Sequence, residues 1–236
     1  MYNVVMQTPE ILVVDDFLAD ESWDRLHNQV QCDEWTQSQT DDKYWHITDG
    51  PNYKASKRFL LDAPFNDNYD IWATAIKTFA DTCEQAQDFV SGYTDIAMRC
   101  HGYPVGSKNP WHTDMGFVTY SYYLHKHWQI NWDSMLLIMP KGTVEYKQMM
   151  RKLPGTVQKD TYAGTGTLEM FEQAEKQKNL IEHGMGYFVA PKPNRLVLIN
   201  KTVVHGITRV DKDAGENVRL TLTGFFNFFK TQVVDV

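Results

Sequence analysis

The spacing of hydrophobic residues changes near residue 95. Before it, an apolar run over residues 11–14 predicts a strand, and the segment that follows predicts a helix capped by Asp20. A second helix is predicted over residues 66–90, after a polar stretch over residues 37–64 that is expected to be mostly loop. The apolar faces of the two helices carry Trp23, Leu26 and Val30, and then Ile71, Ala75, Phe79, Cys83, Ala86 and Val90.

Short strands are predicted for the chain from residue 95 onward. Seven runs are rich in β-branched or large apolar side chains and are bounded by Gly, Pro or Asn: IAMRC, MLLIM, TLEMF, GYFVA, RLVLI, VVHGI and VRLTLTGFF. Helices followed by many strands predict an α+β protein, mainly β, with the strands in a sandwich or barrel. The polar runs over residues 141–166 and 172–186 are insertions that could serve as lids or be solvated hairpins.

Composition and charge narrow the classes of function. The chain has 236 residues, 42% of them hydrophobic, which suits one globular domain with a single core. An aromatic content of 13% suits a sheet-rich protein with an aromatic-lined cavity. The formal net charge of -7 argues against nucleic acid as a partner, because proteins that bind phosphate backbones gather Lys and Arg into patches.

The cysteines and the apolar segments indicate the compartment. Cys32, Cys83 and Cys100 are widely spaced without a Cys-x-x-Cys pair, so we expect reduced thiols in or near the core. The N-terminal residues lack a basic region followed by a long apolar run, and no stretch approaches the roughly 18 apolar residues of a membrane span. These features predict a soluble cytoplasmic protein with no membrane partner.

A His-x-Asp triplet, formed by His112 and Asp114, is the first candidate for chemistry. Alone it is weak evidence, since composition predicts about 0.7 such triplets in this chain. His205 strengthens it, because it stands at the end of a strong strand pattern rather than in a polar loop. Two His and one carboxylate from separate strands of a β core are the facial triad that leaves open positions on non-heme Fe(II).

Arg219 follows His205 by fourteen residues, on a strand whose two faces differ. Apolar residues occupy one face, and Arg219, Thr221 and Thr223 occupy the other. Outward exposure would explain the polar face without any function. An inward Arg219, assisted by a Thr hydroxyl, would instead pair with a carboxylate, which is the chemistry needed to hold the distal end of 2-oxoglutarate.

The residues around the triplet resemble a known family. Tyr103-x-x-Gly106, with His112 nine residues after the Tyr and Asp114 beyond it, is similar to the Y-x-x-G-x-x-Y-x-x-H-x-D signature of the prolyl 4-hydroxylase-like Fe(II)/2-oxoglutarate dioxygenases. The resemblance extends over most of the chain, through ILVVDDFLADESWDRL at the start, GTLEMF, and PKPNRLVLINKTVVHGI around the distal His. Asn109 departs from the signature, which has its second Tyr there.

The resemblance implies a fold and a set of site residues. The fold would be a double-stranded β-helix, or jelly roll, over residues 95–236, with a strand and helices over residues 1–94 packed on its larger sheet, in one domain. The catalytic iron ligands would be His112, Asp114 and His205. The residues that bind 2-oxoglutarate would be Arg219, with Tyr103 and Thr221 as hydrogen-bonding helpers.

The resemblance also implies a reaction. An unactivated C–H bond would be hydroxylated, on a prolyl or other peptidyl residue or on a free amino acid, while 2-oxoglutarate and O2 yield succinate and CO2. Besides Fe(II) and 2-oxoglutarate, ascorbate is a candidate cofactor. Two alternatives stay open: a cupin-type metal enzyme, which has no need of Arg219, and a sugar-binding jelly roll, which would bind no iron.

Aromatic residues and other histidines near the triplet are further candidates. Substrate contacts are predicted for Trp111, Phe117 and Tyr122, although these residues and the adjacent Tyr120 and Tyr123 would serve equally well as core aromatics. The histidines without a partner at metal-ligand spacing are expected to be structural or solvated: His46, His101, His125, His127 and His183. Trp45 and Tyr53 could belong to a lid.

Overall fold

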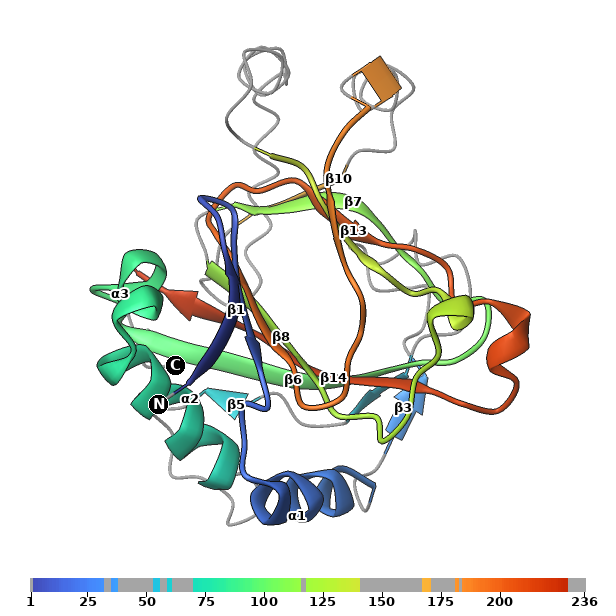
Figure 1. The fold of residues 1–236 in the computed structure, drawn as a ribbon, viewed down its shortest axis with the longest axis horizontal. Coiled ribbons are helices and arrows are strands. Elements are labelled where there is room, and N and C mark those ends of the chain that lie inside the picture. Colours follow the sequence, from blue (N-terminus) through green and yellow to red (C-terminus); the bar gives the residue numbers. More distant parts are fainter. Residues whose placement is uncertain are drawn as a thin grey trace, which may run out of the picture.

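The computed structural model of the protein describes residues 2–31, 35–37, 53–55, 59–60, 70–115, 118–140, 167–170, 181–182 and 184–228. These residues form three layers, with helices on the outside of a larger sheet and a smaller sheet on its other side (Figure 1). The helices are α1 (Asp20–Gln31), α2 (Asp70–Thr82) and α3 (Glu84–Val90). Two single turns of 3-10 helix, η1 (Ile130–Trp132) and η2 (Lys212–Ala214), lie in connections between strands.

Both sheets are built from antiparallel pairs. The larger sheet has the order β1 (Asn3–Gln7), β2 (Ile11–Asp15), β12 (Leu196–Ile199), β8 (Val118–Tyr123), β14 (Arg219–Asn227), β6 (Asp95–Tyr103), β4 (Tyr53–Ala55) and β3 (Trp35–Gln37), and β5 (Phe59–Leu60) also pairs with β6. The smaller sheet has the order β10 (Thr167–Met170), β7 (Asn109–Met115), β13 (His205–Ile207), β9 (Leu136–Ile138) and β11 (Tyr187–Val189). The strands β6 to β9, and then β11 to β14, alternate between the sheets, which confirms the predicted double-stranded β-helix.

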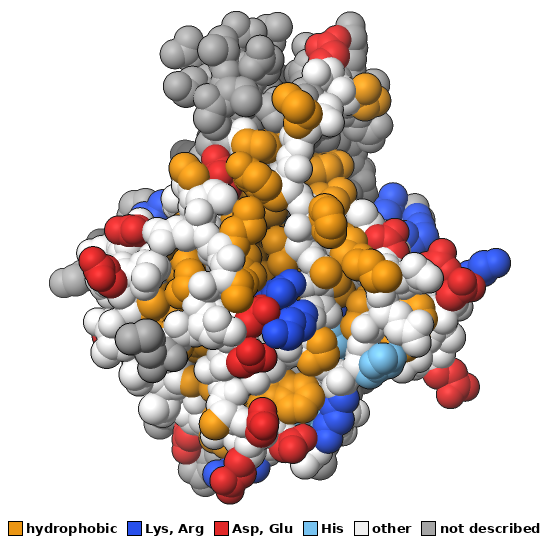
Figure 2. All heavy atoms as spheres, viewed as in Figure 1, with side chains coloured by type: hydrophobic (Ala, Val, Ile, Leu, Met, Phe, Trp, Pro, Cys, Tyr) orange, Lys and Arg blue, Asp and Glu red, His pale blue; other side chains and the backbone are white. Residues whose placement is uncertain are grey.

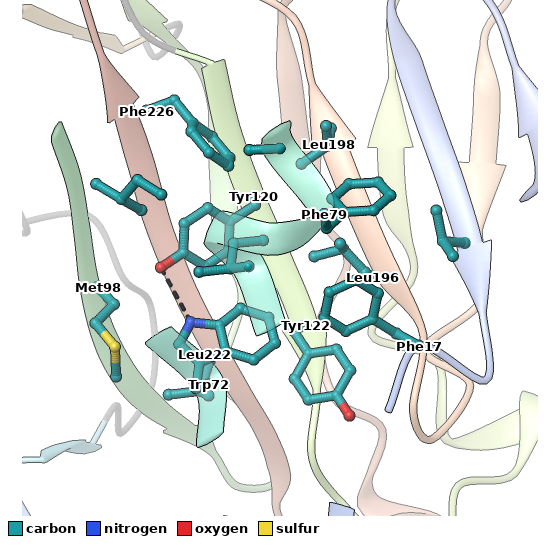
Figure 3. Close-up of a cluster of buried hydrophobic side chains, with 14 of the residues drawn as sticks. Phe17, Trp72, Phe79, Met98, Tyr120, Tyr122, Leu196, Leu198, Leu222 and Phe226 are labelled. Atoms are coloured by element: carbon teal, nitrogen blue, oxygen red, sulfur yellow. Dashed lines mark hydrogen bonds between the residues drawn. The ribbon is translucent and has the colours of Figure 1, made fainter. Parts of the chain in front are cut away.

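The outer face of the larger sheet and the three helices share one hydrophobic core. Leu26 of α1, Phe79 of α2 and Phe89 of α3 belong to a buried cluster with residues of the sheet. Tyr120 and Tyr122 of β8 point from the sheet into this cluster, where Trp72 of α2 stacks on Tyr122 with ring centroids 4.6 Å apart (Figure 3). The predicted packing of helices on the larger sheet is therefore confirmed.

The second predicted helix is in fact two helices, which corrects the prediction. Cys83 separates α2 from α3 with an extended backbone, at φ -88° and ψ 114°. Its N–H still bonds to Phe79 of α2, while its carbonyl accepts from the N–H of Ala86 in α3. No Pro or Gly stands at the break. The change of direction keeps both helices on the core cluster, so tertiary packing overrides the helical pattern.

The buried face of α2 is also rotated from the predicted one. Ile71 and Ala75 are only partly buried, and the fully buried positions are Trp72, Ile76, Phe79 and Ala80. Large side chains decide this orientation, because Trp72 occupies the space over β8 that the smaller Ala75 could not fill.

The predicted strands are confirmed, and others were missed. All seven apolar runs contain a strand, β6, β9, β10, β11, β12, β13 or β14. The structure adds β1, β7 and β8, and β3 to β5 fall within or at the start of the stretch expected to be loop. Trp45 and most of the two insertions lie outside the described residues, as do Cys32, His46, Phe117 and His183.

Alternation along the strands separates the outer face of the larger sheet from its interior face. In β8, Tyr120 and Tyr122 join the helix-side core, whereas Thr119 donates a hydrogen bond to Asp114 of the smaller sheet. Ile96 and Met98 of β6 also belong to the helix-side core. Odd-numbered residues of β6, β8 and β14 therefore face the space between the two sheets.

Gly224 allows β6, β14 and β8 to approach closely in the core. A Cβ at this position would collide with the carbonyl oxygen of Ala97 and the hydroxyl of Tyr120. That hydroxyl donates to the Ala97 carbonyl at 3.1 Å and accepts from the Trp72 indole at 3.4 Å (Figure 3). The glycine thus makes room for the hydrogen bonds that a buried Tyr and Trp need.

The remaining sequence expectations about the core and surface can be compared with the described residues. Cys83 and Cys100 are buried in the core and are not joined in a disulfide, as predicted. None of the described helices is long and apolar enough to cross a membrane. On the face seen in Figure 2, hydrophobic side chains gather toward the middle around a small group of acidic and basic side chains, and other acidic side chains lie toward the periphery.

Candidate active site

Strands β7 and β13 bring the two predicted histidines and the predicted aspartate together. His205 is the register partner of His112 across the two strands, and Asp114 lies two residues further along β7 on the same face. The Nε2 atoms of His112 and His205 lie 3.9 and 3.4 Å from the carboxylate oxygens of Asp114. One potential ligand atom from each residue lies within 4.8 Å of the other two. We call these three residues the triad.

Two hydrogen bonds hold the triad in place. Nδ1 of His205 lies 3.0 Å from the carbonyl oxygen of Val203 and donates to it, so Nε2 is the ring nitrogen that faces Asp114. The Thr119 hydroxyl donates to Asp114 at 2.5 Å. The smaller sheet thus supplies the triad, and the larger sheet fixes the orientation of its carboxylate.

The triad keeps its aspartate ionised although it is buried. The side chain of Asp114 is 9% exposed, and burial alone would raise its pKa. The hydrogen bond from His205, the charges of His112 and His205, and the hydroxyl of Thr119 outweigh burial and lower the pKa to about 2.

The donor set of the triad fits a divalent transition metal. Two imidazole nitrogens and one carboxylate, buried and converging from adjacent strands, are the ligand types that bind non-heme Fe(II) and leave several positions open. The backbone bond to Nδ1 of His205 is the outer support that metal-binding histidines usually have.

Arg219 is buried inside the barrel without an ionic partner among the described residues. It is 1% exposed and faces the interior at the first position of β14. Its three guanidinium nitrogens are buried and make no hydrogen bond. Its guanidinium carbon lies 5.1 Å from the ring centroid of Tyr103 and 5.0 Å from that of Tyr123. Since burying an unpaired charge is costly, this position is suited to bind an anionic ligand.

The two predicted helpers of Arg219 lie beside it. Tyr103 is the register partner of Arg219 on β6, and burial raises the pKa of its hydroxyl although the Arg219 charge opposes this. Thr221 is fully buried one interior position further along β14. Tyr123, on the other flank of Arg219, was grouped with the nearby tyrosines in the sequence and not assigned to this position.

The predicted substrate contacts are only partly supported by position. Tyr122 points to the outer side of the larger sheet, where its hydroxyl donates to Asn194 at 2.6 Å, so it does not fit a role in a pocket between the sheets. Tyr123 faces the interior instead. Trp111 is half-buried and alternates with His112 along β7, so the two side chains leave opposite faces of that strand.

The other described histidines lie outside the triad. His125 is buried, with Nε2 2.7 Å from the carbonyl oxygen of Pro191, and burial lowers its pKa to about 4. His127 is exposed against Trp132, with ring centroids 5.2 Å apart. His101 faces the interior and stacks on Tyr103 at 6.0 Å. Structural or solvated roles, as expected from the sequence, suit His125 and His127.

Solved structures with the same architecture are known, although sequence comparison finds no relative. No protein-family model matches the chain, and no curated protein sequence matches it. A prolyl-4-hydroxylase from Pseudomonas putida matches with a TM-score of 0.56 at 15% identity, covering 92% of each chain. A Trichoplax adhaerens prolyl hydroxylase, solved with a peptide fragment of hypoxia inducible factor, matches with a TM-score of 0.59 at 14% identity, over 97% of this chain and 88% of that one.

The chain has the fold of the Fe(II)/2-oxoglutarate oxygenases. HygX from Streptomyces hygroscopicus, solved with nickel, 2-oxoglutarate and hygromycin B, has a TM-score of 0.55 at 12% identity and covers 94% of this chain and 85% of its own. The resemblance to the prolyl 4-hydroxylase-like branch that the sequence predicts is thus confirmed at the level of the fold. Two of these structures were solved with different ligands, one with a peptide fragment and the other with hygromycin B.

Proposed function

We propose that the protein is an Fe(II)- and 2-oxoglutarate-dependent oxygenase that hydroxylates an unactivated C–H bond of a peptidyl residue or a small molecule. The reaction consumes the substrate, 2-oxoglutarate and O2, and it yields the hydroxylated product, succinate and CO2. The fold likeness supports the enzyme class, and the triad supplies ligands suited to Fe(II). The observation that carries the proposal is the buried, unpaired Arg219, which faces the same interior space as the triad.

The proposal gives each residue a role. His112, Asp114 and His205 hold the iron, and Arg219 binds the distal carboxylate of 2-oxoglutarate through the planar fork of its guanidinium group. When bound, iron and 2-oxoglutarate supply the oxidising chemistry. The chain itself excludes water and orients its ligands, because Arg219 and the triad are buried.

Tyr103 and Thr221 support Arg219 in this scheme. Both lie beside it on the interior face, and both carry hydroxyls that can donate to a bound carboxylate. Tyr103 stays neutral because its pKa is raised, so its hydroxyl keeps the proton needed for donation.

Arg219 also favours this function over the two alternatives. A cupin-type metal enzyme without 2-oxoglutarate has no use for a buried guanidinium in the barrel, and leaving it unpaired would cost stability. A sugar-binding jelly roll would leave the convergence of the triad unexplained.

Titration with Fe(II) and 2-oxoglutarate under anaerobic conditions tests the proposal. The wild-type protein should develop a weak visible metal-to-ligand charge-transfer band. His205→Ala should lose the band, because one of its ligands is gone. Arg219→Ala should need at least about 30-fold more 2-oxoglutarate, since removing one partner of a buried charge pair costs about 2 kcal/mol or more.

The exposed Arg209 offers a matched control. Its Nη1 donates to the carbonyl oxygen of Gly106 at 2.6 Å on the surface, so Arg209→Ala should bind 2-oxoglutarate as the wild type does. Absence of the band in folded wild-type protein, or an unchanged 2-oxoglutarate titration in Arg219→Ala, would contradict the proposed function.

A further inference from the structure

A second arginine on the interior face of the larger sheet is left without a role by the proposed function. Arg99 is the interior-facing residue of β6 two positions before His101. It is half-buried, and its Nε atom is fully buried without a hydrogen-bond partner in the described part of the chain. No described carboxylate makes an ion pair with it.

Hydroxyl groups surround Arg99 in the strand register. Thr223 of β14 pairs with Arg99 on one side and with Ser121 of β8 on the other. All three residues are odd-numbered and therefore lie on the faces of their strands that point into the space between the two sheets. The backbone thus places one cation beside two hydroxyl groups, of which that of Thr223 lies 3.4 Å from the Thr221 hydroxyl, and such a set of groups can bind an anion.

The position of Arg99 lies between the two parts of the proposed active site. Thr119, which donates to Asp114, is one interior position beyond Ser121 along β8. From the spacing of strands and residues, the Cα atoms of Thr119 and Arg99 are about 12 Å apart, and an Arg side chain extends over about half of that distance. Arg219 lies on the opposite side of Arg99, two interior-facing positions along β14 from Thr223, which is the register partner of Arg99.

The interior face has too few negative groups to balance its arginines. Among the described residues of β6, β8 and β14, its one carboxylate is Asp95. This residue lies about 13 Å from Arg99 along β6 and accepts a hydrogen bond from Asn227. With iron and doubly charged 2-oxoglutarate bound as proposed, the charges of Asp114, Arg219 and Arg99 leave one positive charge over. A singly charged anion would balance it.

We propose that Arg99 binds the carboxylate of the primary substrate, which is a small monocarboxylate. This inference rests on the proposed function and deepens it. A carboxylate matches both the single excess charge and the bidentate geometry of a guanidinium group, whereas a phosphate would bring a second negative charge. A prolyl residue inside a peptide is neutral and would leave the buried Nε of Arg99 without an anionic acceptor.

A binding experiment with paired acids and amides tests the assignment. The probes are short series of straight-chain monocarboxylates and N-acetylated amino acids, each compared with its neutral primary amide. The anaerobic protein is first saturated with Fe(II) and 2-oxoglutarate, so that the charge-transfer band reports whether the proposed function itself holds. Each probe is then titrated, and the shift of that band and of the melting temperature is recorded.

The inference predicts that the protein binds an acid but not its amide, and that the affinity for the acid depends on Arg99. At least one free acid should shift the band and raise the melting temperature, while its amide has no effect at the same concentration. Arg99→Leu should require at least tenfold more of that acid, Arg99→Lys should retain part of the affinity, and both should titrate with 2-oxoglutarate as the wild type does. Arg209→Leu is the matched control and should behave as the wild type.

Several outcomes would overturn the inference without touching the proposed function. Free acids that bind no better than their amides, including the case in which neither binds, would show that no carboxylate is recognised. A lower melting temperature of Arg99→Leu with unchanged acid binding would mean that Arg99 pairs within the chain. Weaker 2-oxoglutarate binding in Arg99→Leu would assign Arg99 to the co-substrate. Loss of the band from the wild type would instead overturn the proposed function.

Discussion

Asn194 shows how one polar side chain can join three parts of the fold. Its φ of 60° places it in a turn before β12, and its side-chain oxygen accepts from the N–H of Leu18 at 2.9 Å and from the hydroxyl of Tyr122 at 2.6 Å. Its side-chain nitrogen donates to the carbonyl oxygen of Leu18 at 2.8 Å. The entry to α1 and the helix-side face of β8 are thereby tied to the turn that leads into β12.

Replacing Asn194 should therefore destabilise the whole protein. Asn194→Ala leaves a buried hydroxyl and two backbone groups of Leu18 without partners, so we expect the free energy of unfolding in urea to fall by about 3 kcal/mol. Tyr122→Phe removes only one of these bonds and should cost about 1 kcal/mol. Equal losses in the two variants would show that the Leu18 bonds contribute nothing.

The sequence predicts the candidate site better than its surroundings. Arg219 could be placed because apolar and polar residues alternate along its strand, and His112 and Asp114 because their spacing resembles the family signature. His205 could be placed because it ends a strong strand pattern. The sequence does not predict which residues of β8 face the interior of the barrel. All of its residues from Val118 to Tyr123 are buried, so the hydrophobic pattern does not distinguish the two faces of the strand. Tyr122 was therefore assigned to the pocket, although Tyr123 faces the interior. Arg99 was hidden inside an apolar run and drew no attention as a single charge.

At the scale of elements, long apolar runs predict strands well and tertiary context decides the rest. The central strand β12 could be predicted because burial on both faces makes it continuously apolar, and β14 because large apolar residues alternate with polar ones along it. The edge strand β1 has alternating exposed and half-buried residues, and its signal is weak. Cys83 breaks the second helix without any local signal, because the break follows from packing on the sheet.

An ion pair connects β2 to the turn before β12 and should make stability depend on pH. Arg195 contacts both carboxylate oxygens of Asp15, at 2.6 and 3.0 Å, and Lys192 lies 2.9 Å from one of them. Burial raises the pKa of Asp15, but the hydrogen bonds and charges of Arg195 and Lys192 outweigh it, so the pKa is lowered from its ordinary value of 3.8. The stabilisation is complete above 3.8 and is lost as the pH falls through the lowered pKa.

At neutral pH, Asp15→Asn should lower the stability of the protein as protonation of Asp15 does at low pH. We expect the variant to lose about 2 kcal/mol of unfolding free energy at pH 7, since it gives up charge-assisted bonds, and the gap should narrow as the pH falls below 3.8. Urea unfolding of both proteins across this range measures the gap. Asp16→Asn, at an exposed neighbour with one 3.3 Å contact to Lys192, should change little at any pH. A gap that stays constant down to low pH would contradict the assignment.

At the scale of the whole molecule, the helices and the two sheets depend on one another. Residues before position 95, such as Leu12 and Phe79, share a core with Tyr120 and Leu222 from the jelly-roll strands. A second core between the sheets joins Val13 of β2 to Leu136 of β9. Neither part can bury its apolar surface alone, so we propose that residues 1–236 fold as one cooperative domain.

Thermal unfolding followed at two tryptophans tests this cooperativity. Trp72 is fully buried between α2 and the larger sheet, whereas Trp132 packs with Tyr103 and Val210 at the far side of that sheet. With 5-fluorotryptophan incorporated, the ¹⁹F signals of both residues should shift at the same temperature, together with the far-ultraviolet circular dichroism. Single Trp→Phe variants assign the signals. Loss of the Trp72 signal well below the transition of Trp132 would show that the helices form a separate unit, because melting of the shared core must otherwise affect both sides of the sheet at once.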